Sequence, residues 1–270
     1  MENALIIESP QNPRVKAAVK LRKSNVRRQT GETLVEGYRE ILRASDSGWR
    51  FKELYCCPEL YLDLEADKLV SKIRSSGVTV YLCSETAFRK MSYRDTSDGL
   101  MALSPLVGKK LDELKLPDNP LLLIAEDLEK PGNLGTILRT ADATGVDAVI
   151  ACDHKTDINN PNVIRASIGT LFFMPVAEAS TEETLLWLKK RGIQSLAAVP
   201  GATQEYTDID MKNGTAIIVG AEDEGLSQTW IEGADHKASI PMLGRNDSLN
   251  VSTAAAILLY EAVRQRRKTP

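Results

Sequence analysis

The sequence is poor in the residues that usually build metal centres and hydrolytic triads. Its 270 residues include two histidines, His154 and His236, and four cysteines. None of them has the spacing of a zinc site, and a Ser-His-Asp triad would depend on one of two histidines. The cysteines, two of them adjacent at Cys56 and Cys57, are expected to be buried, reduced thiols. Any chemistry must therefore rest on other groups or on a cofactor, and no metal is expected.

Long apolar runs are also missing. None approaches the roughly 20 residues that a membrane helix needs. The first ten residues contain acids and no basic stretch of the kind that opens a signal peptide. Hydrophobic residues make up 43% and charged residues 26%, which is ordinary for a globular chain. We expect a cytoplasmic protein with no membrane association, long enough for two domains.

Positive charge is not in excess, since the net charge is −3. Its distribution is uneven, however. Cations crowd one early segment, at Arg14, Lys16, Lys20, Arg22, Lys23, Arg27 and Arg28, and close the chain at Arg264, Arg266, Arg267 and Lys268. Such clusters are typical of phosphate contacts. A solvated helix face has the same composition, and charge alone does not separate the two interpretations.

Strand and helix patterns alternate in both halves of the chain. The first alternation includes a helix expected at 13–29, and it predicts a small α/β domain over 1–107. Residues 108–118 are charged and contain Pro117, as expected for a linker. The second alternation, over 119–270, opens with the continuous apolar run 121–125, typical of a strand buried on both faces.

The second half is therefore predicted to form a parallel sheet with helices on both faces. Further strands are expected at 148–151, 195–199 and 216–219, and helices at 134–144, 184–191 and 249–267. The fold class is α/β. Ligands of such folds bind in loops beyond the carboxyl ends of the strands.

Three loops at such positions carry polar residues and glycines. In the first, Gly132 and Gly135 permit close backbone approach, Asn133 offers an amide, and Arg139 lies one helical turn beyond Gly135. A capped turn beside a surface arginine would look the same.

The second loop, 220–227, holds three acids between two glycines. It lacks the spacing of a calcium loop, and acids at the start of a helix are the simpler interpretation. The third, 240–252, places Ser248, Asn250 and Ser252 at a helix entrance, where ordinary N-capping remains an alternative.

Together and in this order, the loops resemble the SpoU or TrmH family of SPOUT methyltransferases, over roughly 119–267. Asn133-Leu134-Gly135 with Arg139 is similar to the first motif of that family, and 220–225 to the second. Residues 240–242 followed by 248–252 are similar to the third, and 163–169 matches another family segment. One position departs from the family pattern: Ala221 stands where asparagine is usual.

The resemblance extends to the N-terminal half. Residues 35–41 and 98–102 are similar to the L30e-like substrate-binding domain that precedes many such enzymes. The family role of that domain is to hold RNA. It favours the phosphate-contact interpretation of the cations, and the expected RNA-binding residues are Arg14, Lys16, Arg22, Lys23, Arg27, Arg28 and Arg39.

The resemblance implies a deep trefoil knot in the C-terminal domain, a homodimer, and S-adenosylmethionine as cofactor. Composition does not suggest a knot, because knots are essentially absent from ordinary folds. The expected cofactor-binding residues are Gly220, Ile240, Met242, Leu249 and Ser252. The implied reaction is methyl transfer to a ribose 2'-oxygen of RNA, more readily ribosomal than transfer RNA because of the L30e-like domain.

The expected catalytic residues are Arg139, Asn133, Glu222, Ser248 and Asn250. The family assigns activation of the hydroxyl group to the arginine. A guanidinium is hardly ever neutral, so Arg139 is better suited to bind a phosphate or stabilise an alkoxide. Glu222 is expected to orient Arg139.

Two other function classes are compatible with parts of the sequence. An RNA-binding assembly factor with an inactive methyltransferase fold would explain Ala221, but the intact Asn133, Arg139, Glu222 and Asn250 argue against it. A nucleotide-dependent dehydrogenase is disfavoured because no G-x-G-x-x-G follows a strand.

Overall fold

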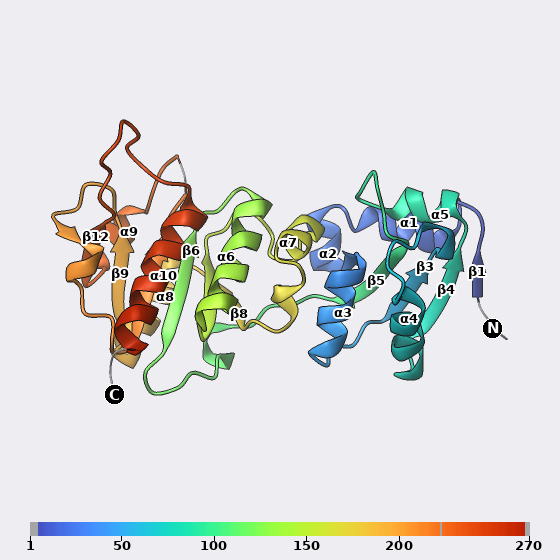
Figure 1. Ribbon diagram of the computed structural model, residues 1–270, viewed down its shortest axis with the longest axis horizontal. Helices are drawn as coiled ribbons and strands as arrows, with labels where there is room; N and C mark the ends of the chain where they lie inside the picture. The colour runs from blue at the N-terminus through green and yellow to red at the C-terminus, as the bar shows by residue number, and fades with distance from the viewer. Residues whose placement is uncertain (1–4, 222, 268–270) are drawn as a thin grey trace. The chain divides into compact units, whose positions relative to one another are not determined.

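The computed structural model describes residues 5–221 and 223–267, which form two compact units (Figure 1). Within the described residues, the N-terminal unit contains 5–107 together with 159–173. The C-terminal unit contains 108–158 and the remainder from 174 onward. The chain therefore passes between the units three times. Both units combine helices and strands, which confirms the predicted α/β class.

The N-terminal unit is built on a mixed five-stranded sheet. Its strand order is β1-β4-β3-β5-β2, in which β1, β4 and β3 are parallel and β5 runs antiparallel to both of its neighbours. The strands are β1 (Leu5–Ile7), β2 (Glu32–Glu36), β3 (Glu53–Cys56), β4 (Thr79–Cys83) and β5 (Leu100–Pro105). The helices before residue 107 are α1 (Pro13–Lys20), α2 (Ser24–Thr30), α3 (Tyr38–Asp46), α4 (Ala66–Ser75) and α5 (Glu85–Met91).

The single helix expected at 13–29 is wrong in one respect, because the structure contains two helices separated by Leu21–Lys23. The break leaves backbone carbonyls without helical partners. The guanidinium of Arg27 donates to two of them, Leu21 O at 2.8 Å and Arg22 O at 3.0 Å. A buried side chain thus satisfies the carbonyls that the break exposes.

The segment 159–173 completes the N-terminal unit, although the chain reaches it only after β7. It contains α7 (Pro161–Ala166) and packs against β2 and α3. The Thr33 hydroxyl donates to Asn159 O at 2.7 Å, and the Phe172 ring lies 5.5 Å from the Trp49 ring between centroids. The domain bounds expected at 107 and 119 stay a prediction. The packing of 159–173 into the N-terminal unit was not part of that prediction.

The C-terminal unit is built on a seven-stranded parallel sheet of order β10-β12-β9-β11-β6-β7-β8. The strands are β6 (Leu121–Glu126), β7 (Ala148–Cys152), β8 (Val176–Ala179), β9 (Gln194–Ala198), β10 (Gln204–Glu205), β11 (Thr215–Val219) and β12 (His236–Ser239). From β6 the chain first adds β7 and β8 on one side and then builds the other side. The order therefore reverses between β6 and β11, where parallel sheets commonly bind ligands.

Helices cover both faces of this sheet, as predicted. They are α6 (Pro131–Thr144), α8 (Thr181–Arg191), α9 (Gln228–Gly233) and α10 (Val251–Arg267). Leu185 and Leu188 of α8 and Trp230 of α9 share one core with alternate residues of β6, β7 and β11. On the other face α6 packs against α10, as Figure 1 shows. Among the described residues, no helix is long and apolar enough to cross a membrane.

Candidate functional site

A cavity of about 420 Å³ lies at the carboxyl ends of β9, β11 and β12. Its volume falls in the usual range for small-molecule sites. Four loop segments line it: Val199 and Pro200 after β9, residues of the 220–226 loop after β11, Ile240 and Met242 after β12, and 247–249 before α10. The chain thus converges on this edge of the sheet from three strands, as the parallel arrangement predicts.

The 220–226 loop closes on itself through its backbone. The Gly225 amide donates to Ala221 O at 3.0 Å. A β-carbon at Gly220 would lie 2.2 Å from Gly225 O, a separation that real β-carbons essentially never show. Glycine is therefore required at 220. Because Ala221 takes part through its carbonyl oxygen, its methyl side chain does not disturb this closure.

Four of the five predicted cofactor-binding residues line the cavity, namely Gly220, Ile240, Met242 and Leu249. Ser252 lies outside its lining. The Ser252 amide and hydroxyl instead donate to Asn250 Oδ1, at 3.0 and 2.6 Å, in the first turn of α10. Asn250 is therefore the residue that caps α10, and Ser252 is bonded to this cap.

The cavity lining combines apolar walls with carboxylates. Ile240, Leu249 and Val251 supply apolar surface, while Asp223 and Glu224 supply negative charge. A ligand with a flat apolar part and a cationic part matches such a lining. S-adenosylmethionine, with its adenine ring and its positively charged sulfonium and ammonium groups, has this chemistry.

The predicted catalytic residues are only partly brought together. The Asn250 amide donates to Asn133 Oδ1 at 3.3 Å, which joins the first and third loops. Ser248 lines the cavity. Arg139 is exposed on α6, and Glu222 lies outside the described residues.

A second cavity of about 80 Å³ adjoins the first and shares Ala221, Asp223 and Glu224 with it. The remaining lining comes from the loops after β6 and β7, at Leu128, Glu129, Lys130, Asn133 and Lys155. Sequence reasoning singled out Asn133 alone among these five. The other four belong to no motif. Their position after two parallel strands was the one feature of the sequence that could have indicated a role in ligand binding.

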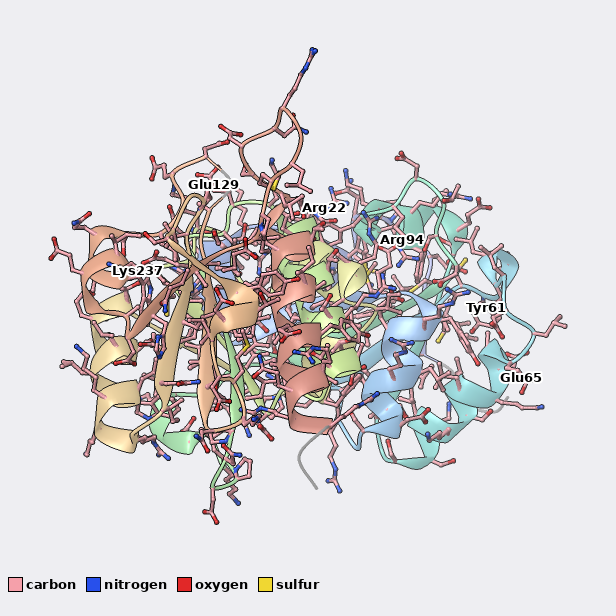
Figure 2. The ribbon with its side chains drawn as sticks, turned by 60° about the vertical axis from the view of Figure 1, so that its left-hand side comes forward. Arg22, Tyr61, Glu65, Arg94, Glu129 and Lys237 are labelled. Carbon is pink, nitrogen blue, oxygen red and sulfur yellow. The ribbon has the colours of Figure 1, made fainter. Side chains whose placement is uncertain are left out.

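An ion-pair network includes two residues of this lining, Lys155 and Glu129. The Lys155 ammonium lies 2.7 Å from Glu129 Oε1 and 2.9 Å from Asp127 Oδ2. Its hydrogen bonds to Glu129 (labelled in Figure 2) and to Asp127 raise the pKa of Lys155. The network links the loop after β6 to the loop after β7, beside Asn133.

The cations of the N-terminal unit fall into two groups. Lys16, Lys23, Arg28 and Arg39 are exposed, which contact with RNA would require. The expectation is wrong for Arg27, which is 2% exposed and bonded to backbone carbonyls, so it cannot reach a ligand on the surface.

Arg14 and Arg22 are exposed but already engaged. The Arg14 guanidinium pairs with Glu53 and lies 4.5 Å from the centre of the Tyr81 ring. Arg22, labelled in Figure 2, donates to Ser92 O at 2.6 Å and lies over the Tyr93 ring. Both retain a face toward solvent.

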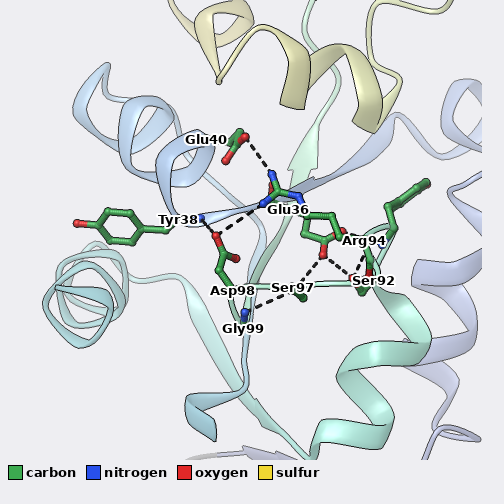
Figure 3. Close-up of polar contacts among 9 residues, drawn as sticks. Glu36, Tyr38, Glu40, Ser92, Arg94, Ser97, Asp98 and Gly99 are labelled. Atoms are coloured by element: carbon green, nitrogen blue, oxygen red, sulfur yellow. Dashed lines mark hydrogen bonds and ion pairs between the residues drawn. The ribbon is translucent and has the colours of Figure 1, made fainter. Parts of the chain in front are cut away.

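Motif residues of the N-terminal unit and the 92–97 loop together form a polar cluster that is largely buried (Figure 3). The Glu36 carboxylate accepts from Ser97 Oγ at 3.0 Å and from the Tyr93 amide at 2.7 Å, and Asp98 accepts from the Tyr38 amide at 2.7 Å. Arg94 donates to Glu40 at 3.1 Å. Burial raises the pKa of Glu40 although Arg94 opposes the shift. The cluster ties the 92–98 loop to the start of α3.

Comparison with known proteins identifies both parts of the chain. The SpoU rRNA Methylase family matches residues 120–260. The chain belongs to this family. An MRM3-like substrate binding domain matches residues 12–102. The resemblance inferred from the three loops, and with it the class of RNA methyltransferases, is confirmed.

Two relatives and one solved structure match over nearly their full length. An uncharacterized tRNA/rRNA methyltransferase of Synechocystis, slr1673, is 34% identical and aligns over 96% of this chain and 94% of its own. The 23S rRNA (guanosine(2553)-2'-O)-methyltransferase RlmP of Bacillus subtilis is 31% identical over 94% of this chain and 97% of its own. The crystal structure of an AdoMet-bound rRNA methyltransferase from Sinorhizobium meliloti superposes with a TM-score of 0.88 at 29% identity, covering 97% and 98% of the two chains.

Proposed function

We propose that this SpoU-family chain transfers a methyl group from S-adenosylmethionine to a ribose 2'-oxygen in ribosomal RNA of the 23S type. The observation that carries the proposal is the cavity at the ends of β9, β11 and β12, with Asn133 and Asn250 joined nearby. The B. subtilis relative named for this reaction and the S. meliloti structure with bound AdoMet support it.

The cofactor is assigned to the larger cavity. Backbone groups of Gly220, Ile240 and Leu249 hold the adenine, and Met242 packs beside it. S-adenosylmethionine supplies an activated methyl group, so the chain has to align the acceptor oxygen and assist loss of its proton. The carboxylates of Asp223 and Glu224 favour the cationic part of the ligand.

The acceptor nucleotide is assigned to the region where the two cavities meet. Asn133, Ser248 and Asn250 orient the ribose, and Arg139 binds the adjacent phosphate or stabilises the developing alkoxide. Glu222 orients Arg139 in this proposal. Lys16, Lys23, Arg28 and Arg39 supply phosphate contacts from the N-terminal unit, together with the free faces of Arg14 and Arg22.

The C-terminal cations are less suited to RNA. Arg266 donates to backbone carbonyls of Met211, Pro120 and Asn213 at 2.9, 3.0 and 2.6 Å. Arg264 is paired with Glu261 at 2.6 Å. Lys268 lies outside the described residues. We therefore assign Arg266 to anchoring α10 rather than to RNA.

A homodimer, a trefoil knot formed by the 220–226 and 240–250 segments with α10, and a cytoplasmic location belong to the same proposal. They rest on the family. Sedimentation equilibrium of the purified protein tests the dimer, with a mass of twice 29.7 kDa as the expected result.

A map of 2'-O-methyl positions in cells with and without the gene tests the substrate. Loss of one site in the large ribosomal RNA is expected. Loss of a site in a transfer RNA, with ribosomal RNA unchanged, would contradict the proposed substrate but would still agree with the proposed reaction.

Arg139→Ala tests the catalytic assignment. The variant should lose at least about a hundredfold in turnover, because a charge that stabilises the reacting oxygen or its phosphate is removed. It should still bind S-adenosylmethionine, since Arg139 is outside the cofactor cavity lining. Tritium transfer to RNA and calorimetry measure the two effects. Arg191→Ala, which removes an exposed arginine from α8 of the same unit, is the matched control and should keep full turnover.

A further inference from the structure

A buried carboxylate lies at the end of β6, the strand that neighbours β11 in the sheet. Glu126, the last residue of β6, is 3% exposed. Its Oε1 accepts from the hydroxyls of Thr181 at 2.6 Å and Ser227 at 2.7 Å, and its Oε2 accepts from the Ser227 amide at 2.7 Å. Hydrogen bonds to a charged acceptor are roughly twice as strong as neutral ones, so the three contacts hold their donors firmly.

Two of these three bonds fix the far end of the 220–226 loop. Ser227 is the next residue along the chain and precedes α9. A serine at this position commonly caps the helix it precedes. The Ser227 side chain makes no capping bond to α9 and is bonded to Glu126 instead.

The near end of the same loop is fixed by the sheet. Val219, which ends β11, is paired with Ala125 of β6, the neighbour of Glu126. Both ends of the loop are therefore attached to the end of one strand, β6. Between these attachments the loop presents Gly220, Asp223 and Gly225 to the cavity.

Glu126 does not itself line the larger cavity, so it has no direct path to a bound cofactor. Its third bond, to Thr181, leads to the start of α8, where Asp153 also accepts from the Thr181 amide at 2.8 Å. The α8 side thus has a second attachment of its own. Removal of the Thr181 hydroxyl is expected to leave the Ser227 bonds in place.

We propose that Glu126 is a positioning residue for the cofactor: it holds the 220–226 loop in its binding shape through Ser227. The inference rests on the proposed function, because it takes the larger cavity as the cofactor site. Glu126→Gln keeps the size of the side chain but removes its charge and one of its two acceptor oxygens, so at most one side of the carboxylate's bonding pattern survives, without charge assistance. The end of the loop is then held less firmly to β6.

The experiment measures the dissociation constant of S-adenosylmethionine by calorimetry, with the melting temperature recorded for each variant. Glu126→Gln should weaken binding about tenfold, the expected size for loss of a bond to a charged group. Thr181→Val, the matched control that removes one donor to the same carboxylate, should change the constant by less than about twofold. At saturating cofactor, the turnover of Glu126→Gln should remain within about twofold of wild type. The substrate for this assay is ribosomal RNA from cells that lack the gene.

Equal weakening by Glu126→Gln and Thr181→Val would overturn the proposal, since the effect would then come from the sheet and α8 in general. So would a Glu126→Gln variant that melts earlier but binds with unchanged affinity. If Glu126→Gln does not fold, Ser227→Ala decides: about threefold weaker binding is expected from loss of the hydroxyl alone, and unchanged binding contradicts the proposal. Absence of binding by the wild-type chain would instead refute the cofactor assignment.

Discussion

At the scale of single residues, neighbouring cations of the same type serve different purposes. Arg27 and Arg28 are adjacent in α2, yet Arg27 is buried against the carbonyls of the α1–α2 break and Arg28 faces solvent. From the sequence, both arginines are predicted to contact RNA. Only the position of the helix break, which depends on packing, shows that one is buried and the other exposed.

Arg27→Ala should destabilise the chain by about 2–3 kcal/mol, because two backbone carbonyls lose their donor and a buried volume is emptied. Arg28→Ala should change the free energy of unfolding by less than about 0.5 kcal/mol. It should weaken RNA binding and reduce the salt dependence of log K by roughly one phosphate contact. Urea unfolding and filter binding at several salt concentrations measure both. Equal stability of the two variants would refute the structural role of Arg27.

His154 couples stability to pH. Its Nε2 lies 2.6 Å from Glu178 Oε1, and this contact raises the pKa of His154 although burial opposes the shift. A raised pKa in the folded state stabilises the protein fully below the unfolded value of about 6.5, and the contribution disappears as the pH rises through the folded value.

His154→Gln should therefore lower the melting temperature more at pH 5.5 than at pH 8.5. The difference is expected to be about 2–4 °C for each kcal/mol of coupling in a chain of this length. Glu178→Gln is the matched control, because it removes the carboxylate that contacts His154. It should therefore abolish the same dependence of stability on pH. An effect of His154→Gln that is equal at both pH values would contradict the coupling.

At the scale of elements, the 220–226 loop depends on one glycine. Gly220→Ala places a β-carbon where Gly225 O lies, so the loop has to open. Overpacking of this kind typically costs 1–3 kcal/mol, and we expect at least tenfold weaker S-adenosylmethionine binding. Gly132→Ala, at a glycine with open space around it, should leave binding unchanged in the same calorimetric assay. Normal binding by Gly220→Ala would refute the assigned loop shape.

Long, apolar elements could be predicted from the sequence, while short polar ones could not. The run expected at 121–125 is β6, and the helix expected at 134–144 is α6, which begins three residues earlier at Pro131. The strand β12 (His236–Ser239) and the helix α9 (Gln228–Gly233) were missed. Pairing of β12 with β9 and burial of Trp230 stabilise them, and neither leaves a periodic pattern in six residues or fewer.

In the candidate site, too, some residues could be predicted from the sequence and others could not. Glycines and polar residues with motif spacing led to Gly220, Ile240, Met242 and Leu249, all of which line the cavity. Val199 and Pro200 also line it, but they became candidates only when the sheet order placed β9 beside β11. Strand order depends on contacts between distant segments, which local patterns do not contain.

At the scale of the whole molecule, the segment 159–173 makes the two halves of the sequence interdependent. Val163, Ile164, Leu171 and Phe172 are buried within the N-terminal unit although they follow β7 of the C-terminal unit. Gly169 approaches α3 so closely that a β-carbon would lie 2.9 Å from Glu40 O. Neither unit is therefore a contiguous stretch of chain.

A fragment comprising residues 108–270 should consequently associate or precipitate, because these apolar side chains lose their cover. Replacing 159–173 with a glycine-serine linker of equal length should restore a monodisperse fragment. Size-exclusion chromatography with light scattering distinguishes the outcomes. A soluble, cooperatively melting fragment with the natural segment would show that 159–173 can be covered without the N-terminal unit.

The same segment sets an order of events during synthesis on the ribosome. The strand β2 and helix α3 are translated early, but the segment that covers them is complete only at residue 173, roughly 65 residues after position 107. At about 5–20 residues per second, the first unit waits about 3–13 seconds for its last piece. The N-terminal unit of this enzyme is thus completed only after β6 and β7 of the C-terminal unit have been synthesised, so nascent chains cut short before residue 173 would carry an incomplete N-terminal unit.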